Sequence, residues 1–275
     1  MRADLHGLFC RSACAYDVGL LRKNYLFSSG VDFSIFSCLK PSWSRGVEVS
    51  HSQGVVIKTG FYSVGENFFG GQFDSVRGFV GVQGELLNSL VAVDKGVSSP
   101  DVVGACFDVL ARRGCIIFRL LSEASTLESM LCAGQKLGKA ELFELFELFS
   151  RTLARGLYHG DLNSSNIMVS DDLGKWSLID FECCVPLACH PALGLAMQVA
   201  SFWDHRVRDI LPRNFLRECL EDFIQSNFSI ESSSVISEFD FYTMGRVGRV
   251  ARTRRLQLAC GGEPDMRKLL LNGGA

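Results

Sequence analysis

The chain has 275 residues, of which 47% are hydrophobic and 21% charged, and its formal net charge at pH 7 is −2. This length suffices for a well-buried core in one large or two modest domains, and the near-neutral charge argues against a nucleic-acid partner. No apolar run reaches the roughly 20 residues needed to span a bilayer, and the interrupted N-terminus predicts no signal peptide, so we expect no export.

The region 31–121 predicts a β-rich N-terminal lobe. Short runs rich in β-branched and aromatic residues are separated by Gly, Ser and Pro, as is typical of strands and turns. Within this region the segment 82–93 has apolar spacing that predicts one helix. The expected strands cover 31–39, 46–51, 54–60, 102–110 and 115–121.

Beyond a hinge near 121–124 the pattern changes to that of helices, so we expect two domains, 1–121 and 122–275. A short helix is expected over 126–134, with Ser125 or Thr126 as its N-cap. Longer helices are expected over 139–157, where an apolar stripe runs beside glutamates, and from 191 onward. The longest apolar run, 191–203, predicts a buried core helix.

Eleven cysteines are scattered among apolar residues. An odd number without paired spacing favours reduced thiols in a cytoplasmic protein over a disulfide framework. The group Cys183, Cys184, Cys189 and His190 contains no CxxC pair, so we do not expect a zinc site there.

Two short apolar runs, 166–169 and 176–180, predict the strands of a hairpin with polar residues at their ends. Phosphoryl transfer requires metal ions held against the phosphates, a lysine on the phosphate oxygens and a carboxylate beside the acceptor hydroxyl. Asp161 precedes the hairpin, Asn166 follows five residues later, and Asp180 ends the second run. Asn166 and Asp180 offer oxygen ligands, which suit Mg²⁺ or Mn²⁺ rather than zinc.

Lys58 lies on the expected strand 54–60 among Val and Ile. A lysine on an apolar strand needs a partner, which a phosphate together with a helix carboxylate can supply. Glu85, near the start of the expected helix in this lobe, is the best candidate carboxylate. Glu66 is the competitor, in surroundings that predict a loop.

The strings VVIK (55–58), HGDLNSSN (159–166) and IDFE (179–182) resemble, in order and spacing, the motifs of the protein-kinase-like superfamily. The resemblance covers roughly 31–200 and implies an α+β, bilobal fold with a β-rich N-lobe containing one helix and a mainly helical C-lobe.

The same resemblance implies roles for individual residues. It makes Asp161 the catalytic base, lets Asn166 and Asp180 bind Mg²⁺, places Lys58 on the ATP phosphates and lets Glu85 position Lys58. His159 is expected to support the loop. The segment over ATP is poor in glycine, with Gly46 alone as a nucleotide-binding candidate, beside Ser42, Ser44 and Arg45 as donors.

Departures from the protein-kinase motifs narrow the range of substrate classes to be expected. Gly160 stands where many protein kinases have Arg, Asn163 where they have Lys, and Glu182 where D-F-G has Gly. No A-P-E follows, so little room is left to dock a peptide. A small-molecule or glycolipid kinase therefore fits better than a protein kinase.

The fuller string over 158–167, with LIDFE at 178–182, is most similar to the bacterial lipopolysaccharide kinase (Kdo/WaaP) family, and within it to kinases of 3-deoxy-D-manno-octulosonic acid (Kdo). This implies transfer from ATP to a sugar hydroxyl of the lipopolysaccharide inner core. It also implies a cytoplasmic protein with peripheral contact to the cytoplasmic face of the inner membrane.

Two alternatives stay open at this point: a soluble kinase of the aminoglycoside or choline type, and a nucleotide-binding pseudokinase. The intact set of Lys58, Asp161, Asn166 and Asp180 favours activity. Two arginine groups remain unassigned. One occupies 246–255 and suits an anionic glycolipid or a membrane; the other comprises Arg206, Arg208, Arg213 and Arg217.

Overall fold

The computed structural model describes the following residues, and every structural statement below concerns them: 46–52, 54–61, 73–74, 78–79, 82–108, 113–170, 175–181, 184–186, 189–203 and 206–243. Contacts divide the chain into two units, which we describe separately. The first comprises Met1–Ser122 and Asp180–Cys183, and the second comprises Glu123–Ile179 and Cys184–Ala275. The expected domains, 1–121 and 122–275, did not anticipate that the short segment after Ile179 packs with the first unit.

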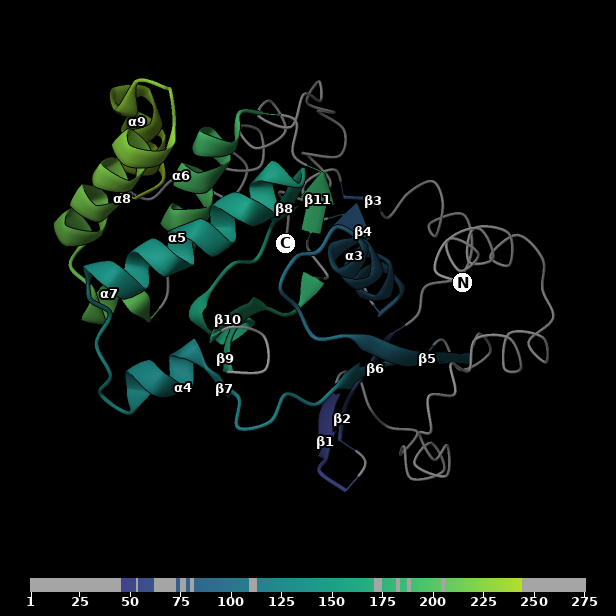
Figure 1. Cartoon of the computed structure of the whole chain (residues 1–275). Coiled ribbons are helices and arrows are strands. Elements are labelled where there is room, and N and C mark those ends of the chain that lie inside the picture. The colour runs from purple at the N-terminus through teal and green to yellow at the C-terminus, as the bar shows by residue number, and fades with distance from the viewer. Residues whose placement is uncertain are drawn as a thin grey trace, which may run out of the picture. The chain divides into compact units, whose positions relative to one another are not determined.

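The first unit is built on a four-stranded antiparallel sheet in the order β1-β2-β6-β5 (Figure 1). Its strands are β1 (Gly46–Ser50), β2 (Val55–Phe61), β5 (Val102–Asp108) and β6 (Arg113–Arg119). They confirm the strands expected within 46–60 and 102–121, whereas 31–39 lies outside the described residues. The short strands β3 (Phe73–Asp74) and β4 (Gly78–Phe79) form a separate pair.

Strand β2 lies inside this sheet, with Lys58 opposite Val47 of β1 and Ile116 of β6. Side chains alternate along a strand, so Lys58 and the buried Ile57 point to opposite faces. Helix α3 (Val82–Asp94), the one helix among the described residues of this unit, confirms the expected helix and packs against β2, β5 and β6. Glu85 lies in its first turn, where the helix dipole favours a carboxylate.

The second unit begins with β7 (Ser125–Thr126) and α4 (Leu127–Cys132). Thr126 is the N-cap, because its Oγ1 accepts a hydrogen bond from the Ser129 N–H at 3.1 Å. This selects Thr126 from the two expected caps. A single side-chain oxygen thus satisfies one of the unpaired N–H groups at the helix start.

Helix α5 (Lys139–Ala154) ends three residues before the predicted end at Leu157. Gly156 adopts a φ of 75°, a left-handed conformation that favours glycine, and its N–H bonds to Leu153 O at 2.8 Å. The chain therefore leaves the helix, and Leu157 begins strand β8 (Leu157–His159) instead. The apolar stripe predicted the helix but not this turn.

The predicted hairpin is confirmed. β9 (Ile167–Ser170) pairs with β10 (Lys175–Leu178), and β7 adds to the other edge of β9. β10 ends at Leu178, so Asp180 lies two residues beyond the strand rather than at its end. β8 pairs separately with β11 (Cys184–Pro186), which places His159 opposite Cys184.

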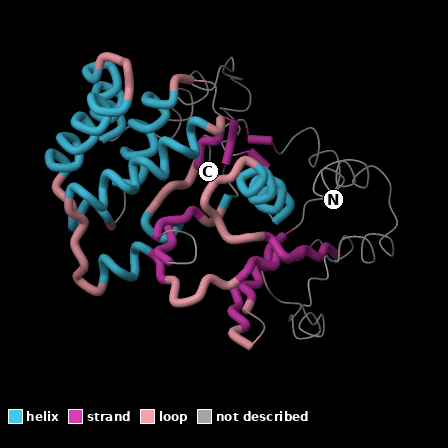
Figure 2. Tube along the Cα trace, in the orientation of Figure 1, coloured by secondary structure: helices cyan, strands magenta, loops and turns pink. Residues whose placement is uncertain are grey.

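Four further helices complete the described part of this unit: α6 (Pro191–Trp203), α7 (Val207–Ile210), α8 (Arg213–Asn227) and α9 (Ser232–Thr243). α6 is the buried helix predicted from its composition, and it packs against α5, α8 and α9 (Figure 2). Aromatic rings join the helices, with Phe146–Phe223 centroids 5.6 Å apart and Phe149–Phe202 centroids 5.9 Å apart. Among the described helices, none combines the length and apolar character needed to cross a membrane.

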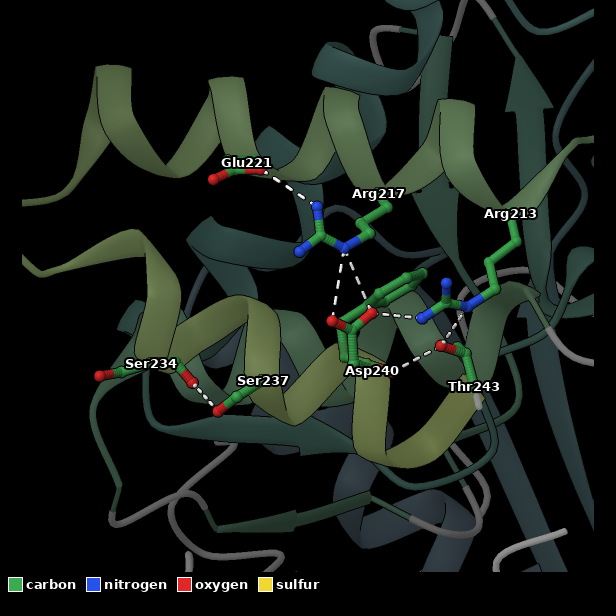
Figure 3. Close-up of polar contacts among 8 residues, drawn as sticks. Arg213, Arg217, Glu221, Ser234, Ser237, Asp240 and Thr243 are labelled. Atoms are coloured by element: carbon green, nitrogen blue, oxygen red, sulfur yellow. Dashed lines mark hydrogen bonds and ion pairs between the residues drawn. The ribbon is translucent and has the colours of Figure 1, made fainter. Parts of the chain in front are cut away.

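Ion pairs connect α8 to α9 (Figure 3). Arg213 and Arg217 of α8 both donate to the Asp240 carboxylate of α9, and Arg213 Nε also donates to Thr243 Oγ1 at 2.9 Å. Arg217 further pairs with Glu221 on its own helix at 3.3 Å. Two of the four unassigned arginines in 206–217 therefore join helices. The segment 246–255 lies outside the described residues.

Candidate active site

Lys58 is held by two carboxylates of the first unit. Its Nζ lies 2.7 Å from Glu85 Oε2 and 2.8 Å from Asp180 Oδ1. The Glu85 side chain is only 4% exposed, so its charge depends on this partner. The structure thus brings together three residues that are far apart in the sequence and that were all predicted as site residues.

The charge on Lys58 is maintained by these carboxylates. Burial alone lowers the pKa of Lys58, but the charges of Glu85 and Asp180 and their hydrogen bonds outweigh it. The net result is a pKa above the ordinary value of 10.5. Lys58 is therefore a fixed cation at physiological pH, suited to hold phosphate oxygens.

Asp180 adopts an uncommon backbone conformation, with a φ of 61°. Left-handed φ values are costly for most residues and are tolerated best by Gly, Asn and Asp, so they are retained where the surrounding structure enforces them. Here the neighbouring Phe181 is buried and its carbonyl accepts a hydrogen bond from Asn88 Nδ2 at 2.8 Å. The segment after Ile179 is thereby fixed onto helix α3.

Asn88 is a positioning residue that the sequence analysis did not identify. It lies three residues after Glu85, a spacing that places both side chains on one helix face. Helix α3 thus holds Lys58 through Glu85 and the Asp180 segment through Asn88. The available signal was an amide side chain one turn after the predicted glutamate.

Replacing Asn88 with Ala is expected to cost roughly 1 kcal/mol of unfolding free energy, because the buried Phe181 carbonyl loses a donor. It is also expected to raise the KM for ATP, since the Asp180 segment loses its attachment to α3. Asn227→Ala is the matched control, because Asn227 Nδ2 donates to the Phe223 carbonyl at 2.9 Å within α8. Thermal melting and initial-rate kinetics on both variants test this. An equal KM change in both would reduce Asn88 to a stability role.

The predicted catalytic loop lies in the second unit, between β8 and β9. Asp161 is exposed, whereas the neighbouring Leu162 is buried and anchors the loop. The Asn166 amide Nδ2 donates to the Asp161 carbonyl at 2.8 Å, and Ile179 N–H donates to the Asn166 carbonyl at 3.0 Å. The five-residue spacing therefore forms a closed loop, in which Asp161 is exposed to solvent.

Two further residues shape this loop. His159 is fully buried and its Nε2 donates to the Ile179 carbonyl at 2.9 Å, which agrees with the expected structural role. Asn163 caps the 3₁₀ turn Ser164–Asn166, because its Oδ1 accepts from the Ser165 N–H at 2.9 Å. Where protein kinases carry a lysine, this chain thus carries a capping amide.

The remaining predicted residues have simpler settings. Gly46 is the first residue of β1, and its carbonyl accepts from Thr59 Oγ1 at 3.2 Å, next to Lys58. Residues 40–45 of the expected ATP-covering segment, Glu66, Glu182 and Cys183 lie outside the described residues.

Asn166, in the second unit, and Asp180, in the first, are the predicted metal-binding residues, and each carries a side-chain oxygen. Asn166 uses its amide nitrogen in the bond to the Asp161 carbonyl, and its amide oxygen takes no part in that bond. Asp180 gives Oδ1 to Lys58 and retains a second carboxylate oxygen. Oxygen donors of this kind suit a hard divalent cation. Within the described ranges, no group of three or more His, Cys, Asp or Glu side chains is arranged for a metal ion.

Part of the chain resembles a known protein family. Residues 85–189 match the sequence model of the Lipopolysaccharide kinase (Kdo/WaaP) family, whereas the comparison with curated proteins finds no match. The solved structure of WaaP in complex with acyl carrier protein is 14% identical, with a TM-score of 0.51 over 84% of this chain and 94% of that one.

Two other solved structures are similar at lower scores. The bifunctional kinase-methyltransferase WbdD is 17% identical with a TM-score of 0.46, covering 86% of this chain and 49% of that one. A divergent Toxoplasma kinase lacking the glycine-rich loop is 10% identical with a TM-score of 0.47, covering 81% and 96%. The chain therefore spans about half the length of WbdD.

The likeness to WaaP shows the fold, a mixed α/β fold of the protein-kinase-like type, as the motifs predicted. The family match covers Glu85, Asp161, Asn166 and Asp180, and it leaves Lys58 outside. Residues 85–189, which make up less than half of the chain, are thus similar to the lipopolysaccharide kinase (Kdo/WaaP) family.

Proposed function

We propose that this protein is a kinase that moves the γ-phosphoryl group of ATP to a sugar hydroxyl in the Kdo-bearing inner core of lipopolysaccharide. The observation that carries the proposal is the placement of Lys58 between Glu85 and Asp180. A lysine paired with a helix glutamate, beside a metal-binding aspartate, is the arrangement that kinases use for phosphates. The family of residues 85–189 supports a lipopolysaccharide sugar as the acceptor.

Each residue has a defined task in this proposal. Lys58 holds the α- and β-phosphates of ATP, with Glu85 fixing its position and Gly46 lying in the strand that enters the nucleotide site. Asp161 acts as the base for the acceptor hydroxyl. Asn166 and Asp180 hold Mg²⁺, which when bound neutralises charge on the phosphate oxygens.

The transfer step balances without a further reactant. The acceptor hydroxyl gives its proton to the Asp161 carboxylate as its oxygen forms a bond to the γ-phosphorus. The bond between the γ-phosphorus and the bridging β–γ oxygen breaks, and ADP leaves with that electron pair. Because Asp161 is exposed, it can release the proton to water after each turnover.

We place this reaction at the cytoplasmic face of the inner membrane, with peripheral contact to the lipid. A glycolipid acceptor is presented there, and ATP is available on that side. Co-sedimentation with vesicles that contain the acceptor checks the placement, with vesicles lacking it as control. If the protein sedimented equally with vesicles that contain the acceptor and vesicles that lack it, binding to the acceptor would not be the cause of membrane contact.

Replacing Asp180 with Asn is expected to raise the Mg²⁺ concentration needed for half-maximal ATP binding by roughly 10- to 100-fold, because a charged ligand becomes neutral. Asn tolerates the left-handed backbone almost as well as Asp, so the loop conformation at φ 61° should persist. Nucleotide binding is measured against Mg²⁺ concentration, with Asp222→Asn, an exposed aspartate outside this cluster, as control. An unchanged Mg²⁺ dependence in Asp180→Asn would remove it from the metal site.

The proposed function is tested by measuring ATP consumption with Mg²⁺, with and without a Kdo-bearing lipid A precursor. Turnover that requires this acceptor and is lost in Asp161→Asn supports the proposal. Turnover with an aminoglycoside or choline instead would assign a soluble small-molecule kinase. Binding of ATP without turnover on any acceptor would assign a pseudokinase.

A further inference from the structure

A polar pocket of about 400 Å³ opens beside the catalytic loop, entirely within the second unit. One wall is the catalytic-loop segment 163–165, a second is Glu128 in the first turn of α4, and the third is Arg206, Arg208 and Asp209 at α7. The walls meet because α4 packs against the 3₁₀ turn Ser164–Asn166. No task in the phosphate chemistry requires this pocket.

The chemistry of the lining selects the ligand class. The volume lies in the range of small-molecule sites, and every lining residue is polar or charged. Hydroxyl, amide and carboxylate groups offer both donors and acceptors, which match the hydroxyl groups of a sugar. Guanidinium groups add a preference for a carboxylate or a phosphate.

The two arginines of this pocket differ from the two nearby arginines of α8. Arg213 and Arg217 join α8 to α9 through Asp240 (Figure 3). Arg206 Nε pairs with Glu128 at 2.9 Å, and Arg206 is 66% exposed. Arg208 is 57% exposed and lies 3.8 Å from Asp209. An exposed guanidinium has five N–H groups and can therefore donate hydrogen bonds to an additional anion.

The position of the pocket relative to Asp161 suits an acceptor. Asn163 lines the pocket and lies two residues after Asp161, so their Cα atoms are at most about 7 Å apart. The Asn163 side chain is fixed, because its Oδ1 accepts from the Ser165 N–H at 2.9 Å. A sugar held at Asn163 therefore lies close to Asp161 on the same loop.

We infer that the pocket lined by Glu128, 163–165, Arg206, Arg208 and Asp209 receives the sugar acceptor, and that Arg206 and Arg208 bind an acidic group on it. This inference rests on the proposed function and adds to it the residues that select the acceptor. The acidic group is a carboxylate or a phosphate, since both match a guanidinium. It assigns Asn163 and Ser165 to the sugar hydroxyls.

The test measures equilibrium binding without nucleotide, so that its result does not depend on turnover. The protein variants are Arg206→Gln, Arg208→Gln and the double variant. Arg151→Gln is the matched control, because Arg151 is 62% exposed and also paired with a glutamate. The probes are a Kdo-bearing lipid A precursor, its Kdo methyl ester, and the same precursor without its lipid A phosphates.

The double variant is expected to bind the full precursor roughly 10- to 100-fold more weakly, as for the loss of hydrogen bonds to a charged group. Arg151→Gln is expected to bind as the wild type does. One of the two neutralised probes lacks the acidic group that the arginines bind. The wild type should bind that probe as weakly as the double variant binds the full precursor. The double variant should bind that probe no more weakly than the wild type does. The methyl ester identifies a carboxylate in this way, and the dephosphorylated precursor identifies a phosphate.

Three results would overturn the inference. The first is that the wild type does not bind the precursor, and the second is that the double variant binds it as tightly as the wild type. The third is that, with both neutralised probes, the double variant still binds as much more weakly than the wild type as it does with the full precursor. The proposed function fails separately. Arginine-dependent binding without phosphoryl transfer would refute the kinase activity alone. Phosphoryl transfer that is unchanged by the Arg206 and Arg208 substitutions would refute only the assignment of the pocket to the acceptor.

Discussion

Asp161→Asn is expected to lower kcat for the Kdo-bearing acceptor by roughly 10²- to 10⁴-fold, the range that a general base contributes. The substitution keeps the size of the side chain and removes only the proton acceptor. The loop should stay intact, because Asn166 binds the backbone carbonyl of Asp161 and not its carboxylate. Steady-state kinetics with varied ATP and varied acceptor measure the effect, and the KM for ATP is expected to stay close to that of the wild type.

The control is Asp222→Asn, which removes an exposed carboxylate that pairs with Lys139 far along the sequence from the loop. Its kcat should match that of the wild type, because surface ion pairs contribute little. If Asp161→Asn also retained normal turnover, Asp161 would not be the base. A rise in the KM for ATP with normal kcat would instead assign Asp161 to nucleotide binding.

Lys58→Met is expected to lower kcat by roughly 10²- to 10³-fold, the cost of removing one preorganised electrostatic contact. It should also lower the free energy of unfolding by roughly 1–3 kcal/mol, because the nearly buried Glu85 loses its cation. Activity assays and thermal or denaturant unfolding measure the two effects. The double variant Lys58→Met with Glu85→Gln should recover part of the stability and none of the activity.

The stability effect of Lys58 has a defined pH dependence. The pKa of Lys58 is raised in the folded protein, so its stabilisation is fully present below the ordinary value of 10.5. It is lost only as the pH rises through the higher folded value. The stability difference between wild type and Lys58→Met should therefore be constant between about pH 7 and about pH 10 and decrease above that range. A difference that vanished near neutral pH would contradict the ion pairing.

The local elements could be predicted well from the sequence. Helix α3, helix α6 and the hairpin β9–β10 follow from apolar periodicity and composition, which depend on neighbouring residues alone. The end of α5 was predicted three residues too late, because apolar spacing continues through Leu157 while the left-handed Gly156 ends the helix. The extent of the unit containing Asp180 was also not predictable, since it depends on packing against α3.

The site shows the same division. Motif spacing identified Lys58, Glu85, Asp161, Asn166 and Asp180, and the structure places Lys58 between Glu85 and Asp180. Asn88 was missed, because an amide on a helix shows no function until its partner, the Phe181 carbonyl, is known. The arginines of 206–217 could not be assigned separate roles from the sequence, since what distinguishes them is the partner that each contacts in the folded chain.

The sequence by itself determined which residues are candidates for the site, because the predicted catalytic loop and the predicted metal-binding segment are short motifs recognised by residue type and spacing. Only the tertiary structure decided which carboxylate pairs with Lys58 and which arginines line the pocket beside Asn163. The physical reason is that ion pairing and burial depend on distance in space. Residues such as Lys58 and Asp180, separated by 122 positions, come within 2.8 Å only through folding.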